Sequence, residues 1–281
     1  MKKNKIIILG ENSFIASNLI NLLKKNNHNF VTISKKKIDL TKKQSTNKLT
    51  KILKSNDILV FISAIAPVKN FRMLIQNLEI CHNVFTVLKS KKIKYFLYVS
   101  SDAVYSDSKT PINEKSKTEP ENLHGFMHLM RENILKLLGI KMCIVRPTLV
   151  YGASDPHNGY GPNKFVRNAQ LKKNIFLFGK GEERRDHIHV NDVGEIIYLL
   201  IKKKYVGIIN LVTGKVVSFF EISKKIKDIY GTPIVFKKRN GPMPHNGYRA
   251  FNNNLLKKVL PNKKLINLLD WLDEKEIYKK K

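Results

Sequence analysis

A short apolar strand, a glycine and an amphipathic helix follow one another near the start of this chain. Residues 5–9 read Lys-Ile-Ile-Ile-Leu, Gly10 ends this run, and leucine and isoleucine recur at helical spacing through residues 19–23. The alternation of strand and helix then continues without internal repeats. Strands are expected at residues 30–34, 57–62, 93–99 and 141–145, and helices at 73–88 and 121–138. This order predicts an α/β protein with a doubly wound parallel sheet.

The turn after the first strand has the spacing of a dinucleotide-binding turn. Gly10, Ser13 and Ala16 lie three residues apart between the strand and the helix. A small third residue allows close helix packing, and the small Ser13 lets the backbone approach a pyrophosphate. The sequence therefore predicts a Rossmann-type fold that contacts its cofactor through Gly10, Ser13, Phe14 and Ile15.

Two further motifs lie at the end of the fourth strand and at the start of the helix after it. Residues 100–105 read Ser-Ser-Asp-Ala-Val-Tyr, and residues 124–128 read His-Gly-Phe-Met-His. In open parallel sheets, ligands bind beyond the carboxyl ends of the strands, which makes residues 100–105 a candidate site. His124 and His128 are four residues apart, so they share one face of the predicted helix.

This arrangement resembles the extended short-chain dehydrogenase/reductase superfamily, in its nucleotide-sugar epimerase, dehydratase and reductase branch. That family carries Ser-Ser-x-x-Val-Tyr at the strand end and then Tyr-Gly-x-x-Lys on a helix. The resemblance implies an NAD(P)-dependent enzyme for a nucleotide-linked sugar, with Ser101 at the catalytic Ser/Thr position. The second motif departs from the pattern, because His124 replaces the catalytic Tyr and His128 replaces the Lys.

Three later motifs extend the resemblance over nearly the whole chain. They are Arg-Pro-Thr-Leu-Val-Tyr-Gly at residues 146–152, Tyr-Gly-Pro-Asn at 160–163, and the segment from Gly179 to Val193, which contains Arg-Asp-His-Ile-His-Val. The resemblance implies that Asn163, Arg185 and Tyr105 contact the substrate, the first two at its diphosphate. On a purely structural interpretation, Asp186 orders a turn and Asp192 caps the helix at residues 194–200.

The resemblance also implies a division of the chain into two parts. Residues 1–150 would form the dinucleotide-binding core, to which part of 186–215 returns. Residues 151–281 would form mainly a smaller substrate-binding lobe. A homodimer is implied through the helices at 73–88 and 121–138.

The end of the second strand bears on which dinucleotide binds. NAD-preferring enzymes usually place an acidic residue there, whereas this chain has Ser34 and then three lysines, Lys35 to Lys37. Cations at this position favour NADP(H) and leave NAD(H) open. The resemblance places Asp39 and Leu40 near the adenine and His128 at the nicotinamide ribose. The other expected cofactor contacts lie at strand ends and are Ser34, Lys35, Ser63, Ala64, Ala66 and Ser100.

The paired replacement by histidine leaves three interpretations open. A free tyrosine titrates near pH 10 and needs a neighbouring cation to act as a base, whereas a free histidine titrates near 6.5. A largely neutral His128 therefore suits His124 as the acid/base, with Ser101 bonding the sugar oxygen. Alternatively, the protein binds nucleotide sugar or cofactor without turnover. A metal site at His124 and His128, with His157 as a third ligand, is a further interpretation, and we expect no metal.

Charge and cysteine content bear on partners and compartment. The net charge is +30, but lysines occur throughout the chain and the lysine runs lack the interleaved aromatics that stack on bases. We therefore expect no nucleic-acid partner. Cys81 and Cys143 lie in apolar segments, as buried thiols of a reducing compartment do. No apolar run reaches membrane-spanning length, so we expect a cytoplasmic protein without a membrane partner.

Overall fold

Residues 4–153, 155–156 and 158–274 are described by the structure, a computed structural model, and they separate into two units. The first unit holds residues 4–106, 114–147 and 194–210. The second holds 107–113, 148–193 and 211–274, with the gaps just given. Each unit therefore combines segments that are distant in sequence.

A six-stranded sheet forms the centre of the first unit. Its strands, in spatial order, are β2 (Phe30–Ile33), β1 (Ile6–Leu9), β3 (Ile58–Phe61), β4 (Tyr95–Val99), β5 (Met142–Pro147) and β9 (Gly207–Leu211). The pairs from β2 to β5 are parallel, with Ile7 beside both Val31 and Leu59. Parallel strands are covered on both faces, which explains why β1, β3 and β4 are apolar or aromatic throughout. The predicted α/β fold with a parallel central sheet is confirmed.

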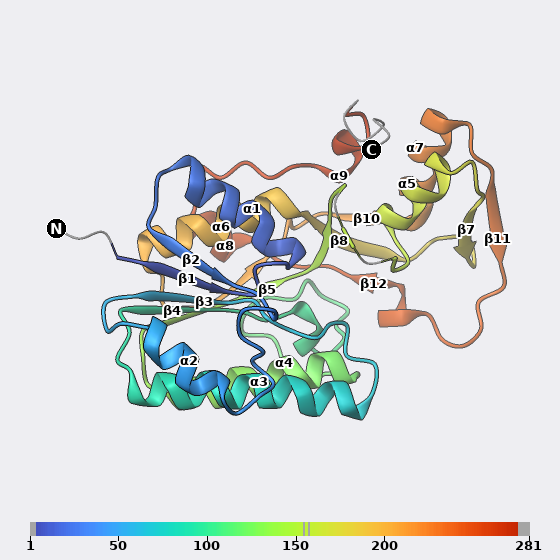
Figure 1. Cartoon of the computed structure of the whole chain (residues 1–281). Helices are drawn as coiled ribbons and strands as arrows, with labels where there is room; N and C mark the ends of the chain where they lie inside the picture. Colours follow the sequence, from blue (N-terminus) through green and yellow to red (C-terminus); the bar gives the residue numbers. More distant parts are fainter. Residues whose placement is uncertain (1–3, 154, 157, 275–281) are drawn as a thin grey trace. The chain divides into compact units, whose positions relative to one another are not determined.

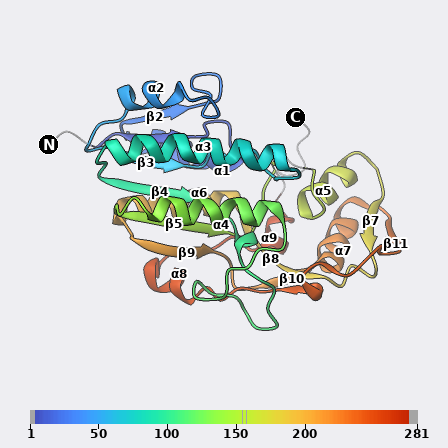
Figure 2. The same ribbon diagram turned by 90° about the horizontal axis from the view of Figure 1, so that it is seen from below.

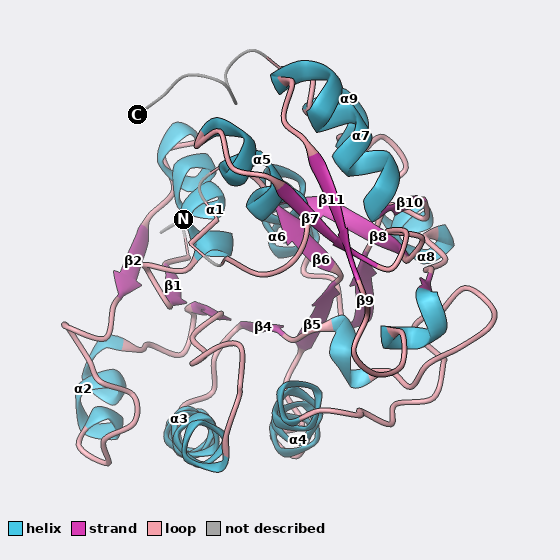
Figure 3. Ribbon diagram, turned by 90° about the vertical axis from the view of Figure 1, so that its right-hand side faces the viewer, coloured by secondary structure: helices cyan, strands magenta, loops and turns pink. Residues whose placement is uncertain are grey.

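Helices cover both faces of this sheet (Figures 1 and 3). On one face lie α2 (Ser45–Ile52), α3 (Phe71–Ser90) and α4 (Leu123–Lys136), and on the other lie α1 (Phe14–Lys25) and α6 (Val190–Lys203). Helices α3 and α4 run side by side (Figure 2). The core under α3 includes Phe61, Tyr98 and Cys81. Both cysteines are free and buried, as predicted, and burial raises the thiol pKa of Cys81 to about 11.

The second unit is built on two small sheets. Strand β8 (Arg184–His189) pairs parallel with β6 (Leu149–Tyr151) and β12 (Tyr248–Arg249), and antiparallel with β10 (Val216–Ser218). Strands β7 (Ile175–Phe178) and β11 (Ile234–Lys237) form a parallel pair. The helical elements of this unit are α5 (Pro162–Gln170), α7 (Phe219–Tyr230), the short helix η2 (Pro244–Gly247), α8 (Asn254–Val259) and α9 (Leu268–Trp271). Its core includes Phe165, Phe219 and Trp271.

The two aspartates of the third late motif hold loops of the second unit. The Asp186 carboxylate accepts hydrogen bonds from the backbone N–H groups of Thr213 and Gly214, so it orders that turn as predicted. The prediction that Asp192 caps a helix is wrong. Helix α6 already begins at Val190, and the Asp192 carboxylate instead accepts bonds from Lys263 and from the Ile266 N–H, each at 2.7 Å. Within the described part of the chain, no helix is both long and apolar enough to cross a bilayer.

Candidate functional site

The turn between β1 and α1 is pressed against the end of β3. Gly10 has φ of +109°, and a Cβ atom there would lie 2.9 Å from the backbone nitrogen of Ser63. The Gly10 N–H donates to the Ile33 carbonyl, and the Ser13 N–H donates to the Gly10 carbonyl, both at 2.9 Å. Only glycine meets both the dihedral and the steric demand here.

The amino terminus of α1 has the features of an anion site. Ser13 is its N-cap but makes no side-chain cap bond, and the first turn contains no acidic residue. The N–H groups of a first helical turn, together with the helix dipole, favour a phosphate. Ser13, Phe14 and Ile15 are half-buried, as residues that line a ligand would be. This turn therefore fits the pyrophosphate of a dinucleotide.

The lysines after β2 differ in their surroundings. Lys37 forms an ion pair with Glu11 at 3.2 Å, and Glu11 also accepts a bond from the Thr32 hydroxyl at 2.8 Å. The bonds from Thr32 and Lys37 hold the pKa of the Glu11 carboxyl below its usual value. Lys35 and Lys36 are exposed as well.

The residues expected near the adenine are held by bonds within the chain. The Asp39 carboxylate accepts from the Thr41 N–H and hydroxyl, at 3.1 and 2.7 Å. The Leu40 side chain belongs to the core, and its carbonyl accepts from Asn83 at 2.8 Å. The Leu40 side chain therefore packs inward, and the expected place of residues 39 and 40 near the adenine stays a prediction.

The loop after β3 is clamped by a buried amide and a buried guanidinium. Asn77 in α3 accepts from the Ile65 N–H and donates to the Ile65 carbonyl, both at 3.0 Å. Arg131 in α4 donates to the Ser63 carbonyl at 2.9 Å and to Asn77. Ala64 and Ala66 are exposed beside this clamp. The sequence gives little signal for Arg131, because a charged residue among the helical positions of α4 is normally solvated.

A buried ion pair supports the end of β4. Glu132 in α4 and Arg146 in β5 share two hydrogen bonds, at 2.9 and 2.5 Å, and both side chains are almost fully buried. The Ser100 hydroxyl donates to the same carboxylate at 2.6 Å. The predicted cofactor residue Ser100 is thus tied to the framework through its side chain. Glu132 was missed by sequence reasoning.

Tyr105 is also a framework residue. Its side chain is 2% exposed, its hydroxyl donates to Asn210 at 2.7 Å, and the Arg146 guanidinium lies over its ring. Burial raises the pKa of its phenol. The hydroxyl of Tyr105 is thus used inside the first unit, and the expected contact with the substrate stays a prediction.

The first turn of α4 lies directly on the short helix η1 (Asp102–Val104). A Cβ atom on Gly125 would stand 2.1 Å from the Ala103 carbonyl oxygen, so only glycine allows this approach. Ser101 caps η1 by accepting from the Ala103 N–H at 3.1 Å, and Asn122 caps α4 in the same way. The packing places His124, the residue before Gly125, beside the segment that follows Ser101.

The two histidines of α4 are in contact. Their ring centroids are 4.7 Å apart and the rings are perpendicular. His128 is buried, and its Nδ1 lies 2.8 Å from the Tyr98 hydroxyl. Burial, and then the neighbouring His124 and Arg131, lower the pKa of His128 well below its usual value, so the ring is neutral at pH 7.

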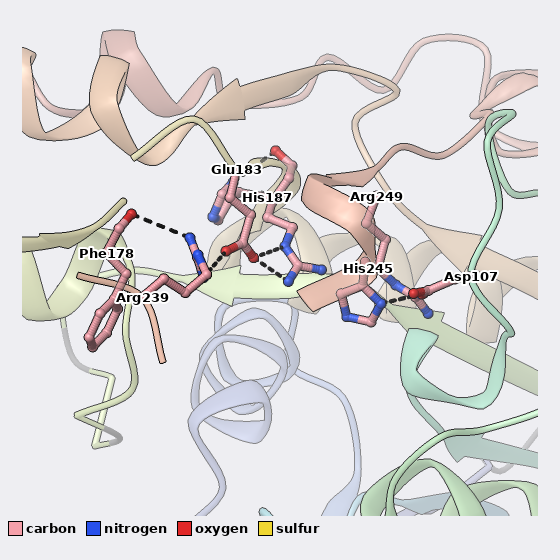
Figure 4. Close-up of polar contacts among 8 residues, drawn as sticks. Asp107, Phe178, Glu183, His187, Arg239, His245 and Arg249 are labelled. Carbon is pink, nitrogen blue, oxygen red and sulfur yellow. Dashed lines mark hydrogen bonds and ion pairs between the residues drawn. The ribbon is translucent and has the colours of Figure 1, made fainter. Parts of the chain in front are cut away.

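A cluster of arginines and carboxylates lies in the second unit (Figure 4). Arg185 donates to the Glu183 carboxylate, at 2.8 Å through Nε, and Arg239 approaches the same carboxylate at 3.5 Å. Arg249 donates to Asp107 at 3.1 Å. His245 and Asp107 point toward each other and are hydrogen-bonded (Figure 4). Three guanidinium groups face two carboxylates, which leaves the cluster positive.

The partner of Arg185 had a signal in the sequence. Glu183 and Arg185 are two apart at the start of a strand, so their side chains share one face. Burial, and then the charges of Arg185 and Arg249, lower the pKa of His245, which keeps the ring neutral beside the arginines.

Asn163 braces a loop in the second unit. Its carbonyl oxygen accepts from the Gly152 N–H at 3.0 Å, and its amide donates to Asp155 at 2.8 Å. The structure gives no support to the metal interpretation. In the described part of the chain, no three His, Cys, Asp or Glu side chains are grouped to hold an ion. His157, its candidate third ligand, lies outside the described residues.

Comparison with known proteins places this geometry in context. Residues 6–211 match the model of the NAD dependent epimerase/dehydratase family. The chain is 26% identical to a dTDP-D-glucose 4,6-dehydratase of Dictyostelium discoideum over 62% of its own length, but it spans only 45% of that protein. It is 24% identical to a GDP-L-colitose synthase of Yersinia pseudotuberculosis, covering 84% of this chain and 86% of that protein.

Solved structures share the fold. One is a UDP-N-acetylglucosamine 4-epimerase from Methanobrevibacter ruminantium M1, with a TM-score of 0.82 and 22% identity over 99% of this chain and 98% of that one. At this identity, the likeness concerns the fold alone.

Proposed function

The chain belongs to the NAD dependent epimerase/dehydratase family, and from that premise we propose that it is an NAD(P)-dependent enzyme acting on a nucleotide-linked sugar. One observation carries the proposal. The same unit contains a glycine turn that fits a pyrophosphate and a helix, α4, whose close packing on η1 sets His124 beside the segment after Ser101. This supports a dinucleotide and a proton-transfer group that act together at strand ends of one sheet.

The cofactor would be held by the β1–α1 turn. Gly10 permits the close approach of the pyrophosphate, and the N–H groups at Ser13 and beyond bind it. Lys35 and Lys36 would select NADP(H) through the 2′-phosphate. When bound, the nicotinamide supplies or accepts the hydride exchanged with the sugar.

The chain's own residues would handle the proton. His124 takes a proton from a sugar hydroxyl, or returns it. The Ser101 hydroxyl bonds the same sugar oxygen. The neutral His128 adds no second positive charge beside His124, which would oppose protonation of His124.

The second unit would hold the nucleotide diphosphate. Arg185 offers a planar donor fork, and the surrounding cluster is positive. Asn163 is the second proposed contact. The reaction class stays at C4 epimerisation, 4,6-dehydration or 4-keto reduction, because all three exchange hydride at the sugar.

We also propose that the protein is a cytoplasmic homodimer that joins through α3 and α4. Phe71 and Ile75 on α3, and Phe126 and Met130 on α4, are exposed apolar side chains with exposed fractions from 39% to 70%. Exposed apolar patches of this kind commonly mark protein interfaces.

Incubation with a panel of nucleotide sugars and their 4-keto forms, with each dinucleotide added, tests the proposed activity. We expect NMR to show conversion of at least one panel member by the wild type and none by Gly10→Trp, which fills the pyrophosphate turn. Binding of dinucleotide and nucleotide sugar without conversion of any member would instead identify a non-catalytic binder.

A further inference from the structure

Tyr98 reaches from the central sheet to the second histidine of α4. It lies on β4, 1% exposed, on the face of the sheet that packs against α3 and α4. Its hydroxyl oxygen is 2.8 Å from Nδ1 of His128. Both side chains are buried, so this bond is shielded from competing water.

The direction of this hydrogen bond follows from the groups around it. Burial raises the pKa of the Tyr98 phenol, so its single proton stays on the oxygen. That O–H needs an acceptor, and among the described residues the acceptor within reach is Nδ1 of His128. Arg131, which also interacts with the hydroxyl, can only donate. The phenol therefore donates to Nδ1, and Nδ1 carries no proton.

A neutral imidazole with an unprotonated Nδ1 carries its proton on Nε2. Every element packed around His128 supports the neutral form. Arg131 and His124 on α4 oppose a further positive charge, Tyr98 on β4 is a neutral donor, and Cys81 on α3 is a buried thiol near Tyr98. Glu132 on α4 is a carboxylate that interacts with Tyr98, and it is committed to Arg146 and Ser100.

We propose that Tyr98 is a positioning residue that fixes His128 as its Nε2–H tautomer, so that this position presents one neutral donor to the bound dinucleotide. The inference rests on the proposed function, because that function places His128 at the cofactor. It adds a residue of β4 that lies outside every sequence motif described above. It also explains how a histidine can serve as a donor beside a second histidine without adding a competing charge.

Nitrogen NMR of protein labelled with ¹⁵N-histidine reads the tautomer directly. The His128 signals are identified by their absence in His128→Gln. In the wild type at pH 7, we expect a protonated Nε2 and an unprotonated Nδ1. In Tyr98→Phe, the two signals should move toward each other as both tautomers become populated.

The matched control is Tyr95→Phe. Tyr95 is a buried tyrosine on the same strand, but its hydroxyl donates to the Tyr205 carbonyl at 2.6 Å and does not contact His128. Its removal should leave the His128 signals in place. A wild-type spectrum with the proton on Nδ1, or unchanged signals in Tyr98→Phe, would overturn the proposal. The wild-type measurement decides this even if the variant does not fold.

Calorimetric titration with NADP(H) and NAD(H) reads the positioning role separately from turnover. Tyr98→Phe should weaken dinucleotide binding by about twofold to tenfold, because the Nε2–H donor of His128 is no longer fixed. Tyr95→Phe should leave dinucleotide binding unchanged. His128→Gln keeps a donor near the Nε2 position and should retain more affinity than His128→Leu. An altered tautomer with unchanged affinity would refute the positioning role. A wild type that binds no dinucleotide would refute the proposed function and leave the tautomer result standing.

Discussion

Gly125 and Ala103 approach each other so closely that a Cβ atom on residue 125 would stand 2.1 Å from the Ala103 carbonyl oxygen. This contact sets α4 on η1 and so sets the position of His124 relative to the loop after Ser101. The glycine of the His-Gly-Phe-Met-His motif is thus required by packing, since no positive φ is involved.

Replacing Gly125 with Ala should therefore damage both stability and the site. We expect the free energy of unfolding to fall by about 1–3 kcal/mol, because the added methyl group would overlap the Ala103 carbonyl oxygen, and relieving this overlap requires a shift of the backbone. Urea denaturation measures this loss. Gly159→Ala is the control, because nothing lies within 4 Å of a Cβ there, and it should change stability little. Equal stability of the two variants would show that α4 can shift freely on η1.

The choice of cofactor should depend on the two exposed lysines after β2. We expect wild-type protein to bind NADP(H) more tightly than NAD(H), and the double variant Lys35→Glu, Lys36→Glu to reverse that order. Lys89→Glu, at an exposed position of α3, controls for the change in net charge. If calorimetry gives equal affinities for the two dinucleotides, and the double variant leaves both affinities unchanged, Lys35 and Lys36 do not contact the 2′-phosphate.

Two adjacent arginines of β8 allow a matched test of the phosphate contact. Arg185 is buried against Glu183, whereas Arg184 is half-exposed and pairs with Glu221 at 3.4 Å. A charge-assisted bond to phosphate contributes about 1.5–3 kcal/mol, so Arg185→Ala should weaken nucleotide-sugar binding about tenfold or more. Arg184→Ala should not. If Arg185→Ala instead loses the dinucleotide and keeps the nucleotide sugar, Arg185 belongs to the other ligand.

Acid should destabilise the fold through three buried histidines. Burial lowers the pKa of His187 to about 3 and of His189 to about 4, and it lowers that of His128 as well. Above pH 6.5 both folded and unfolded chains hold these rings neutral. Below pH 6.5 only the unfolded chain takes up the protons. The free energy of unfolding therefore decreases as the pH is lowered, by up to about 1.4 kcal/mol per pH unit for each histidine.

Urea denaturation between pH 7 and pH 4.5 measures that slope. His187→Asn should flatten it by the share of one histidine, and His82→Asn, at an exposed position of α3, should not. Stability that stays constant over this range would show that the buried rings already carry protons in the folded state.

The fold and the candidate site differ in how far the sequence predicts them. The first strands of the central sheet could be predicted from apolar runs such as residues 6–9, followed by a turn residue such as Gly10, because these are local signals. The order of the strands in the sheet was not predicted. The two small sheets of the second unit were not predicted, because strands such as Tyr248–Arg249 are too short to show a period.

Motif matching located positions in the chain but gave no contacts. It indicated Tyr105 as a ligand contact but did not indicate that the Tyr105 hydroxyl donates a hydrogen bond to the side-chain oxygen of Asn210, 105 residues away in sequence. It gave no sign that Glu132 would pair with Arg146, because a charged residue on a helix is normally solvated. Such pairings depend on which distant segments the fold brings together.

Turnover by His124→Phe tests the central claim most directly. Phenylalanine fills similar space without a transferable proton, so dinucleotide and nucleotide-sugar affinities should be kept while kcat falls by about 10²–10⁴-fold. The double variant His124→Tyr, His128→Lys should recover part of that rate and shift the pH at which the rate breaks. A kcat for His124→Phe equal to that of the wild type would contradict the account, and the proton-transfer group would then be sought at Ser101.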